Sequence, residues 1–188
     1  MYIHTAISKG SKILRDSSIL TANLDSEILM AKALKKNREY ILLNPLEKIS
    51  KKDLNFYKKL IDERSYKKPV AYLVNKKFFW KSEFYINSDT LIPRPETELI
   101  VENALKLTKQ NNKLHVLDIG IGSGCVLLSI LKDRKNFYGT GIDISKKCLN
   151  ISKINALSLN LTRRLKLFNS NIDKFLIGKY DLIVSNPP

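Results

Sequence analysis

The sequence predicts an α/β protein in which a small α-helical domain precedes a parallel, doubly wound sheet. Apolar residues recur at helical spacing through about the first 74 residues. From residue 114 onward, segments typical of buried strands alternate with segments typical of helices. The first of these strands runs into a glycine-rich turn, LDIGIGSGC, and then into an apolar helical run. This order of elements favours right-handed crossovers and a ligand site at the carboxyl ends of the strands.

The glycine-rich turn is the most informative stretch of the chain. Gly120, Gly122 and Gly124 follow the strand, and glycine permits both a tight turn and the close approach of a ligand to the backbone. The N–H groups of the helix behind them would face a polar or anionic ligand. The G-x-G-x-G spacing matches neither the dinucleotide fingerprint nor a P-loop. A plain strand-to-helix turn is the alternative interpretation.

A second strand, in FYGTGIDIS, ends at Asp143. A carboxylate in this position of a doubly wound sheet accepts hydrogen bonds from ribose hydroxyls. Together with the glycine-rich turn, it favours a nucleoside-containing cofactor over the alternative of a surface aspartate without a ligand.

The last strand, in KYDLIVSNPP, runs directly into Asn186, Pro187 and Pro188. Proline has no N–H, so the carbonyls here stay free to accept, and the asparagine amide adds one acceptor and two donors. A planar NH₂ group of a substrate could donate to the Asn186 side-chain oxygen and the Pro187 carbonyl, which would aim its nitrogen at an electrophile. An ordinary strand-terminating turn is the alternative. Because parallel strands end at one edge of a sheet, we expect residues 120–124, Asp143 and Asn186 to form one site.

The sequence divides into three predicted parts: a helical domain at residues 1–74, a β-hairpin linker at 75–92, and a partial sheet domain at 93–188. Asn23 or Asp25 is expected to cap the second helix of the first part. The helical domain could serve packing alone or could dock a protein partner, and its pattern does not separate the two.

The net charge points toward acidic partners in general. Lysine and arginine number 33 against 18 aspartates and glutamates, a formal charge of +15. Such a charge attracts RNA, ribosomes or other acidic partners at low salt. The lysines are scattered along the chain, so we expect a weak electrostatic attraction, ribosome association included, and no specific nucleic-acid binding.

Several classes of protein are disfavoured by the composition. No apolar run is long enough to span a membrane, and the first residues lack the apolar core of a signal peptide. Cys125 and Cys148 have no C-x-x-C spacing, which suits a reducing cytoplasm. His4 and His115 have no neighbouring ligand pattern. We therefore expect a cytoplasmic location, no membrane contact and no metal site.

Five stretches occur in an order and at a spacing that resemble a known family. They are KPVAYLVNKKFFW, TLIPRPETELIVE, VLDIGIGSGCVLLSI, GIDIS and IVSNPP. Over nearly its whole length the chain resembles the HemK/PrmC protein-(glutamine-N5) methyltransferases, which modify peptide-chain release factors. IPRPETE is the distinguishing stretch: the related ribosomal-protein glutamine methyltransferases have a serine after Pro-Arg, and DNA adenine methyltransferases share NPP without this leader.

The resemblance implies a Rossmann-like methyltransferase sheet with S-adenosylmethionine as cofactor. The reaction it implies is N5-methylation of the glutamine in the Gly-Gly-Gln motif of class 1 release factors, in translation termination, with the helical domain contacting the release factor. Asn186 and Pro187 would be catalytic and, with Pro188, would grip the glutamine amide while its nitrogen attacks the methyl carbon in line with the departing sulfur. Residues 93–97 would wall the pocket. The implied cofactor-binding residues are Gly120, Ile121, Gly122, Ser123, Gly124, Asp143, Ile172 and Asn186.

Three departures from the family pattern carry expectations. Asn171 and Ile172 stand where the family usually has an acid and an aromatic near the adenine, so stacking is lost and weaker cofactor binding is expected. Asn75 stands where glycine is common. The family motif is NPPY and its fold continues for further strands, whereas this chain ends at Pro188. We therefore expect a C-terminally incomplete sheet with an apolar strand at an open edge.

These departures leave alternatives open. The chain could be a fragment, the product of a truncated gene, or a chain that a partner completes. An inactive remnant that binds a release factor or the ribosome is the alternative function, and an amino-methyltransferase acting on nucleic acid is a third.

Overall fold

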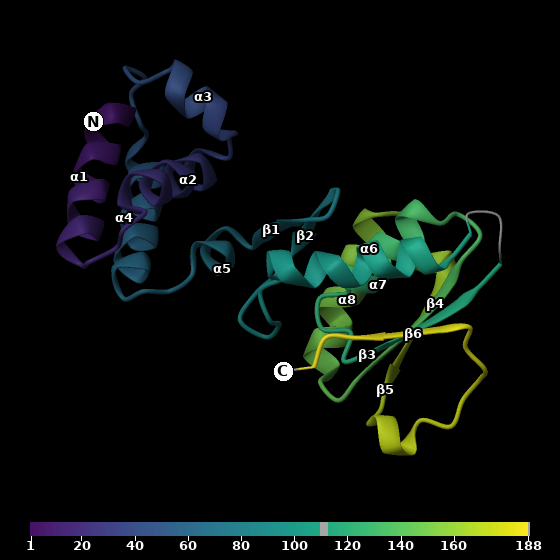
Figure 1. Cartoon of the computed structure of the whole chain (residues 1–188). Helices are drawn as coiled ribbons and strands as arrows, with labels where there is room; N and C mark the ends of the chain where they lie inside the picture. The colour runs from purple at the N-terminus through teal and green to yellow at the C-terminus, as the bar shows by residue number, and fades with distance from the viewer. Residues whose placement is uncertain (110–112, 188) are drawn as a thin grey trace. The chain divides into compact units, whose positions relative to one another are not determined.

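The computed structural model of the chain describes residues 1–109 and 113–187. The chain divides into two compact units, Met1–Asn75 and Lys76–Pro188 (Figure 1). Each unit has its own hydrophobic core. The first unit is helical and the second is built on a parallel sheet. This arrangement confirms the predicted fold class.

The first unit is a bundle of helices whose apolar sides meet in one core. The helices are α1 (Ile3–Asp16), α2 (Ala22–Leu34), α3 (Arg38–Leu43), α4 (Lys51–Ser65) and α5 (Val70–Val74). Large apolar side chains from α1, α2 and α3 are almost fully buried there: Ile3, Leu14, Leu29, Met30 and Ile41. Burial of this apolar surface is the main force that holds the bundle together.

The start of α2 differs from the prediction made from the sequence. The helix begins at Ala22 without a side-chain cap, so the predicted cap by Asn23 or Asp25 is wrong. The Asn23 side-chain oxygen accepts a hydrogen bond from Arg15 at 2.7 Å, and Asp25 forms an ion pair with Arg64 at 2.7 Å. Both side chains are held by partners from other helices, which a local capping rule does not take into account.

The departure at Asn75 has a conformational explanation. Asn75 ends α5 with a φ of 59°, in the left-handed region. Glycine adopts this region at no steric cost, and asparagine adopts it more readily than most other residues. Asparagine is therefore a conformationally compatible replacement for the glycine common in the family.

The second unit opens with an antiparallel hairpin and continues as alternating helices and parallel strands. The hairpin strands are β1 (Lys76–Phe79) and β2 (Ser82–Tyr85). The helices are α6 (Glu98–Leu107), α7 (Cys125–Asp133) and α8 (Lys146–Ser158). The sheet strands are β3 (His115–Ile119), β4 (Tyr138–Asp143), β5 (Leu165–Asn169) and β6 (Leu182–Ser185). Short 3₁₀ turns lie at η1 (Pro95–Thr97), η2 (Thr162–Arg164) and η3 (Ile172–Lys174).

The strand order of the sheet determines where a ligand site can form. The order is β5-β4-β3-β6, and each neighbouring pair is parallel. From β3 the chain moves outward through β4 to β5 and then returns to the other side of β3 as β6. The order therefore reverses between β3 and β6, and the carboxyl ends of these two strands flank the crevice where doubly wound sheets bind ligands.

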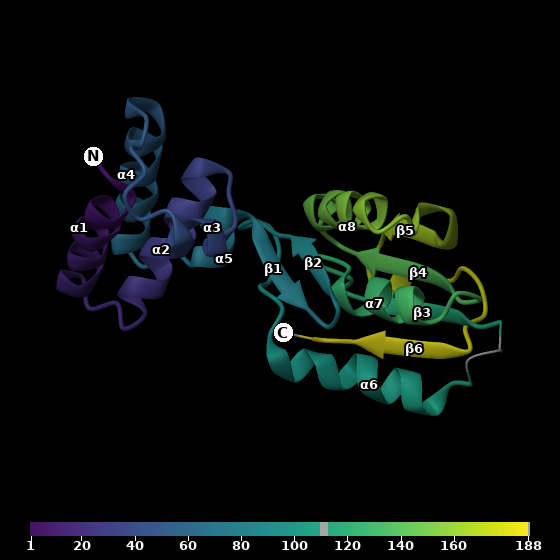
Figure 2. The same cartoon turned by 90° about the horizontal axis from the view of Figure 1, so that it is seen from above.

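The core of the second unit lies between the sheet and its helices. Helices α6, α7 and α8 pack on the sheet (Figure 2). Their apolar side chains share one core with Val116 of β3 and Val184 of β6. Helix α7 lies close to β4: a Cβ atom at position 139 would come within 2.9 Å of the Leu127 side chain. Glycine at this position therefore allows the helix to approach the strand. This packing fixes the strands whose ends carry the candidate site.

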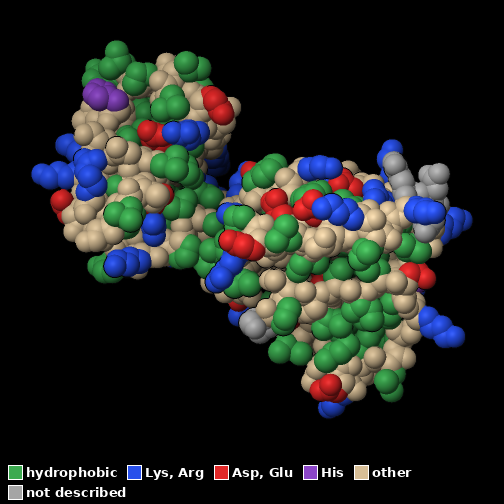
Figure 3. Space-filling view, viewed as in Figure 1, with side chains coloured by type: hydrophobic (Ala, Val, Ile, Leu, Met, Phe, Trp, Pro, Cys, Tyr) green, Lys and Arg blue, Asp and Glu red, His purple; other side chains and the backbone are tan. Residues whose placement is uncertain are grey.

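Strand β6 lies at an edge of the sheet, as predicted from the sequence. Ile183, near its centre, is 58% exposed. In the segment between β5 and β6, Leu176 and Ile177 are exposed, and the Phe175 ring lies 5.5 Å from the ring of Phe168 in β5. Figure 3 shows apolar side chains gathered on the surface of the second unit, toward the lower right. Apolar side chains are therefore exposed both on β6 and on the segment between β5 and β6.

Candidate functional site

The turn after β3 adopts a conformation that requires its glycines. Gly120, Gly122 and Gly124 have φ values of 73°, 56° and 81°, in the region where other residues are strained. A Cβ atom at Gly120 would meet no atom within 4 Å, so the backbone here faces open space. Gly124 then precedes the first turn of α7. The turn thus leaves the backbone at Gly120 accessible at the end of β3.

Asp143, at the end of β4, supports this turn directly. One carboxylate oxygen accepts a hydrogen bond from the Gly122 N–H at 3.0 Å, and the other accepts one from the Ser145 N–H at 2.8 Å. The side chain is nearly buried, at 9% exposure. Each carboxylate oxygen has a second lone pair, so the group can still accept hydrogen bonds from a ligand.

Helix α8 supports the same turn from a second direction. The Ser152 hydroxyl donates to the Gly122 carbonyl at 2.7 Å, and the Asn155 amide donates to the Ser123 carbonyl at 2.8 Å. Asn155 also donates to the Tyr85 carbonyl and accepts from the Tyr85 N–H, which joins the hairpin to the turn. Both polar side chains are fully buried.

Sequence reasoning missed Ser152 and Asn155. A signal was present, because the two residues lie three apart on the buried side of α8, next to Ile151 and Ala156. Residues three apart share a helix face, and buried polar side chains need hydrogen-bond partners. The pair on an apolar face therefore indicated bonds to another element, although it did not indicate which element.

A cavity of about 80 Å³ lies beside the turn, between the carboxyl ends of β3 and β6. Backbone and side chains of the turn, the start of α7, the segment before α6 and the residue after β6 line it: Leu91, Pro93, Thr97, Asp118, Gly120, Ile121, Gly122, Ser123, Cys125, Val126 and Asn186. The switch point of the sheet and the glycine-rich turn therefore coincide.

Asp118 gives this cavity an ionisable group. Its side chain is 3% exposed, and burial raises the pKa of the carboxyl to about 7, with a further upward contribution from the negative charge of Asp143. A cation entering the cavity would favour the ionised form and would lower this pKa. The site is therefore suited to a ligand with a positively charged group near the start of the turn.

The residues predicted from the sequence fall into three sets. The cavity brings together Asn186 and residues 120–123. Asp143 adjoins the cavity through its bond to Gly122. Ile172 lies apart from the cavity lining, in η3 after β5, and is 43% exposed.

The segment after β6 is described only in part. Asn186 and Pro187 are exposed, and Pro188 lies outside the described residues. Among the described residues, no group of His, Cys, Asp and Glu side chains has an arrangement that could hold a metal ion. Within the same part of the chain, no helix has the length and apolar character needed to cross a membrane.

Comparisons with known proteins identify the family of the chain. Residues 5–74 match the PrmC N-terminal domain, and residues 95–188 match the methyltransferase small domain. The release factor glutamine methyltransferase of Leptospira interrogans is 38% identical over 99% of this chain and 66% of its own length. That of Clostridium acetobutylicum is 36% identical over 100% of this chain and 67% of its own length.

A solved structure of a S-adenosylmethionine-dependent methyltransferase from Geobacter sulfurreducens, in complex with S-adenosylhomocysteine, is 27% identical with a TM-score of 0.42. The match covers 49% of this chain and 36% of that one. The chain spans about two thirds of the length of the two curated relatives. The resemblance read from the sequence is confirmed, and the chain belongs to the release factor glutamine methyltransferase family.

Proposed function

We propose that the second unit binds S-adenosylmethionine at the glycine-rich turn and methylates N5 of the glutamine in the Gly-Gly-Gln motif of class 1 release factors. One observation carries this proposal: Asn186 and Gly122 line the same cavity at the switch point of the sheet. A donor held by the turn and an amide held by Asn186 would therefore meet at one place. The family membership supports the choice of donor and acceptor.

The residues around the turn fit such a cofactor. Residues 120–124 would lie along its methionine and ribose part, because the backbone at Gly120, where the turn begins, faces open space. Asp143 would accept hydrogen bonds from the ribose hydroxyls with its remaining lone pairs. Asp118, in the cavity, would accept the ammonium group of the methionine part. Ile172 would lie near the adenine. The cavity of about 80 Å³ holds only one end of this ligand, so the nucleoside would lie along the open carboxyl ends of the strands.

Asn186 and the carbonyl of Pro187 would hold the glutamine amide. The amide NH₂ has two hydrogens, and these two acceptors could each receive one. The amide nitrogen is a poor nucleophile because its lone pair is delocalised. Two acceptors that polarise its N–H bonds and orient the nitrogen toward the methyl group would help it react. Pro188 would complete this grip. When bound, S-adenosylmethionine supplies an electrophilic methyl group on a positively charged sulfur.

The remaining parts of the chain have proposed roles as well. Residues 1–74 would dock the release factor, residues 75–92 would act as the hairpin linker, and residues 93–188 would carry the methyl transfer. The basic charge of the chain would add a weak attraction to the ribosome without specific nucleic-acid binding. A cytoplasmic location follows from a release factor as substrate.

A methyl-transfer assay tests this proposal. Purified class 1 release factor is incubated with the chain and S-adenosylmethionine, and peptides that contain the Gly-Gly-Gln motif are analysed by mass spectrometry. We expect one methyl group on the glutamine with the wild-type chain and none with Asn186→Ala. If the chain binds the release factor but transfers no methyl group, the alternative of a non-catalytic binding protein would be favoured. Methylation of DNA or tRNA in place of the release factor would overturn the assigned substrate.

A further inference from the structure

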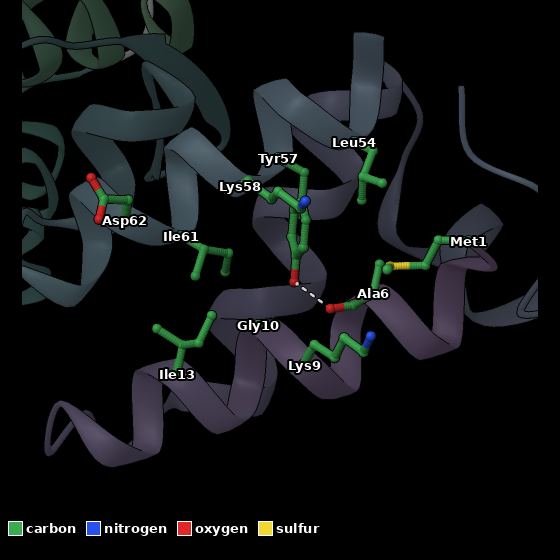
Figure 4. A pocket seen from close by; sticks show the side chains of 10 residues that line it. All are labelled: Met1, Ala6, Lys9, Gly10, Ile13, Leu54, Tyr57, Lys58, Ile61 and Asp62. Atoms are coloured by element: carbon green, nitrogen blue, oxygen red, sulfur yellow. Dashed lines mark hydrogen bonds between the residues drawn. The ribbon is translucent and has the colours of Figure 1, made fainter. Parts of the chain in front are cut away.

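A second cavity, of about 390 Å³, opens in the first unit between α1 and α4. Figure 4 shows Ile13 and Ile61 at one end, Met1 and Leu54 at the other, and Tyr57 between them. A dry cavity of about 150 Å³ is already large enough for benzene, so this groove can take more than one apolar side chain. It shares no lining residue with the cavity beside the glycine-rich turn.

The floor of the groove is uncharged and firmly held. The Tyr57 hydroxyl donates to the Ala6 carbonyl at 3.3 Å and shares a hydrogen bond of 2.6 Å with the Ser26 hydroxyl. Burial raises the pKa of Tyr57 to about 12, so the phenol stays neutral at physiological pH. A Cβ atom at Gly10 would overlap the Tyr57 hydroxyl, so glycine at this position leaves room for the ring.

The lining of the groove carries two lysines, one from each helix. Lys9 of α1 and Lys58 of α4 are exposed, and neither forms an ion pair within the described part of the chain. Asp62 is the one acidic residue of the lining. Residues 1–75 as a whole contain 15 lysines and arginines against 8 aspartates and glutamates. The groove therefore combines an apolar interior with a net positive surrounding.

We propose that this groove docks a segment of the class 1 release factor that presents an apolar side chain next to carboxylates. This inference rests on the proposed function and adds which surface of the helical unit meets the partner. Apolar anchors supply the affinity of such a contact, and opposite charges at the rim guide its approach. A short amphipathic helix is the kind of segment that an apolar groove between helices accepts.

The lining favours a protein partner over RNA. Bases bind by stacking on exposed aromatic rings, and phosphates need several cations along a track. Tyr57 is the one aromatic residue of the lining, and its ring is 2% exposed, so it offers no stacking surface. Asp62 would repel a phosphate. The two lysines could pair with acidic residues of a protein partner while a neighbouring apolar side chain of that partner enters the groove.

Binding of the full chain to a purified class 1 release factor tests the inference. The dissociation constant is measured by biolayer interferometry at physiological salt for Lys9→Glu/Lys58→Glu. The matched control is Lys12→Glu/Lys52→Glu, which makes the same charge change on the same two helices at exposed positions outside the groove. We expect the groove variant to bind on the order of tenfold more weakly than the control.

A second pair of variants tests the apolar interior. Ile13→Ser removes a half-exposed anchor of the groove, and Leu43→Ser removes an 80% exposed apolar residue of α3 outside it. Neither side chain is needed for the buried core, so both variants should fold, which thermal unfolding checks. We expect Ile13→Ser to weaken binding on the order of tenfold and Leu43→Ser to leave it unchanged.

The outcomes separate the groove from the methyl transfer. Groove and control variants that bind alike, or a wild-type chain that does not bind the release factor, would overturn the inference. The inference would also be overturned if the groove variant lost binding to an RNA oligonucleotide but kept its binding to the release factor. If groove variants lose binding while the wild-type chain transfers no methyl group, the groove assignment stands and the proposed catalysis fails. If wild-type and groove variants bind and methylate equally, only the groove assignment fails.

Discussion

Asp143 and Gly122 are joined by a hydrogen bond of 3.0 Å from the glycine N–H to the carboxylate, across the carboxyl ends of β4 and β3. The acidic residue expected to bind a ribose therefore also fixes the turn expected to bind the rest of the cofactor. The two roles are compatible, because the carboxylate keeps lone pairs that face away from the backbone donors. Removal of Asp143 should consequently affect both the stability of the turn and ligand affinity.

Asp143→Ala is expected to weaken S-adenosylmethionine binding strongly and to destabilise the fold. The variant leaves the N–H groups of Gly122 and Ser145 without their acceptor, which costs about 1–3 kcal/mol for a buried donor. Calorimetric titration and urea unfolding measure the two effects. Asp16→Ala, at an exposed position in α1 of the first unit, is the control and should change neither. Unchanged affinity for the Asp143 variant would contradict its assignment to the ribose.

Asn155→Ala is expected to destabilise the glycine-rich turn, although Asn155 is not among the residues assigned to contact the ligand. The variant removes the bonds to Ser123 and Tyr85 and leaves buried backbone groups unpaired, at a cost of about 2–3 kcal/mol in the free energy of unfolding. Asn150→Ala, at an exposed position on the same helix, is the matched control. Chemical denaturation gives the stability, and titration with S-adenosylmethionine gives the affinity. Equal behaviour of the two variants would show that the buried amide does not position the turn.

The contribution of Asp118 to the stability of the ligand-free protein is expected to fall as pH rises from about 4 to about 7. The folded-state pKa of Asp118, about 7, lies above the ordinary value of 3.8, so the folded state binds more protons than the unfolded state in this window. Ionisation of the buried carboxyl then destabilises the fold by an amount on the order of a few kcal/mol. Urea unfolding across the window measures this slope for the wild-type chain and for Asp118→Asn. The same slope in both proteins would contradict the role given to Asp118.

Ile172→Tyr is expected to tighten cofactor binding. An aromatic ring stacks on a nucleobase with about 1–3 kcal/mol, which corresponds to roughly fivefold to 150-fold in affinity. Ile172 is 43% exposed, so a larger side chain has room there. Ile177→Tyr makes the same change at an exposed position further along the segment and should leave the dissociation constant unchanged. If Ile172→Tyr binds S-adenosylmethionine no more tightly than the wild-type chain, the adenine lies elsewhere.

The sequence allowed the parallel sheet and the glycine turn after β3 to be predicted, because strand–helix alternation and glycine spacing can both be read directly from the chain. The apolar residues before Asn186 predicted a buried strand, but in β6 only Val184 is buried and Ile183 is 58% exposed, because β6 lies at an edge of the described sheet. The bonds of Asn155 could not be predicted, since they join residues distant in the sequence. The capping role expected of Asn23 or Asp25 failed for the same reason: a partner from another helix outweighed a local preference. The groove between α1 and α4 likewise depends on how helices cross, which periodicity does not specify.

The central claim, that the glycine-rich turn and Asn186 form one pocket, is tested most directly by an NMR titration. S-adenosylmethionine is added to the ¹⁵N-labelled chain while the backbone amides of Gly120 and Gly122 and the side-chain NH₂ of Asn186 are followed. We predict that all three signals shift with a single dissociation constant. A saturating ligand that shifts the glycine amides but leaves Asn186 unchanged, or that shifts only residues of the first unit, would contradict the account.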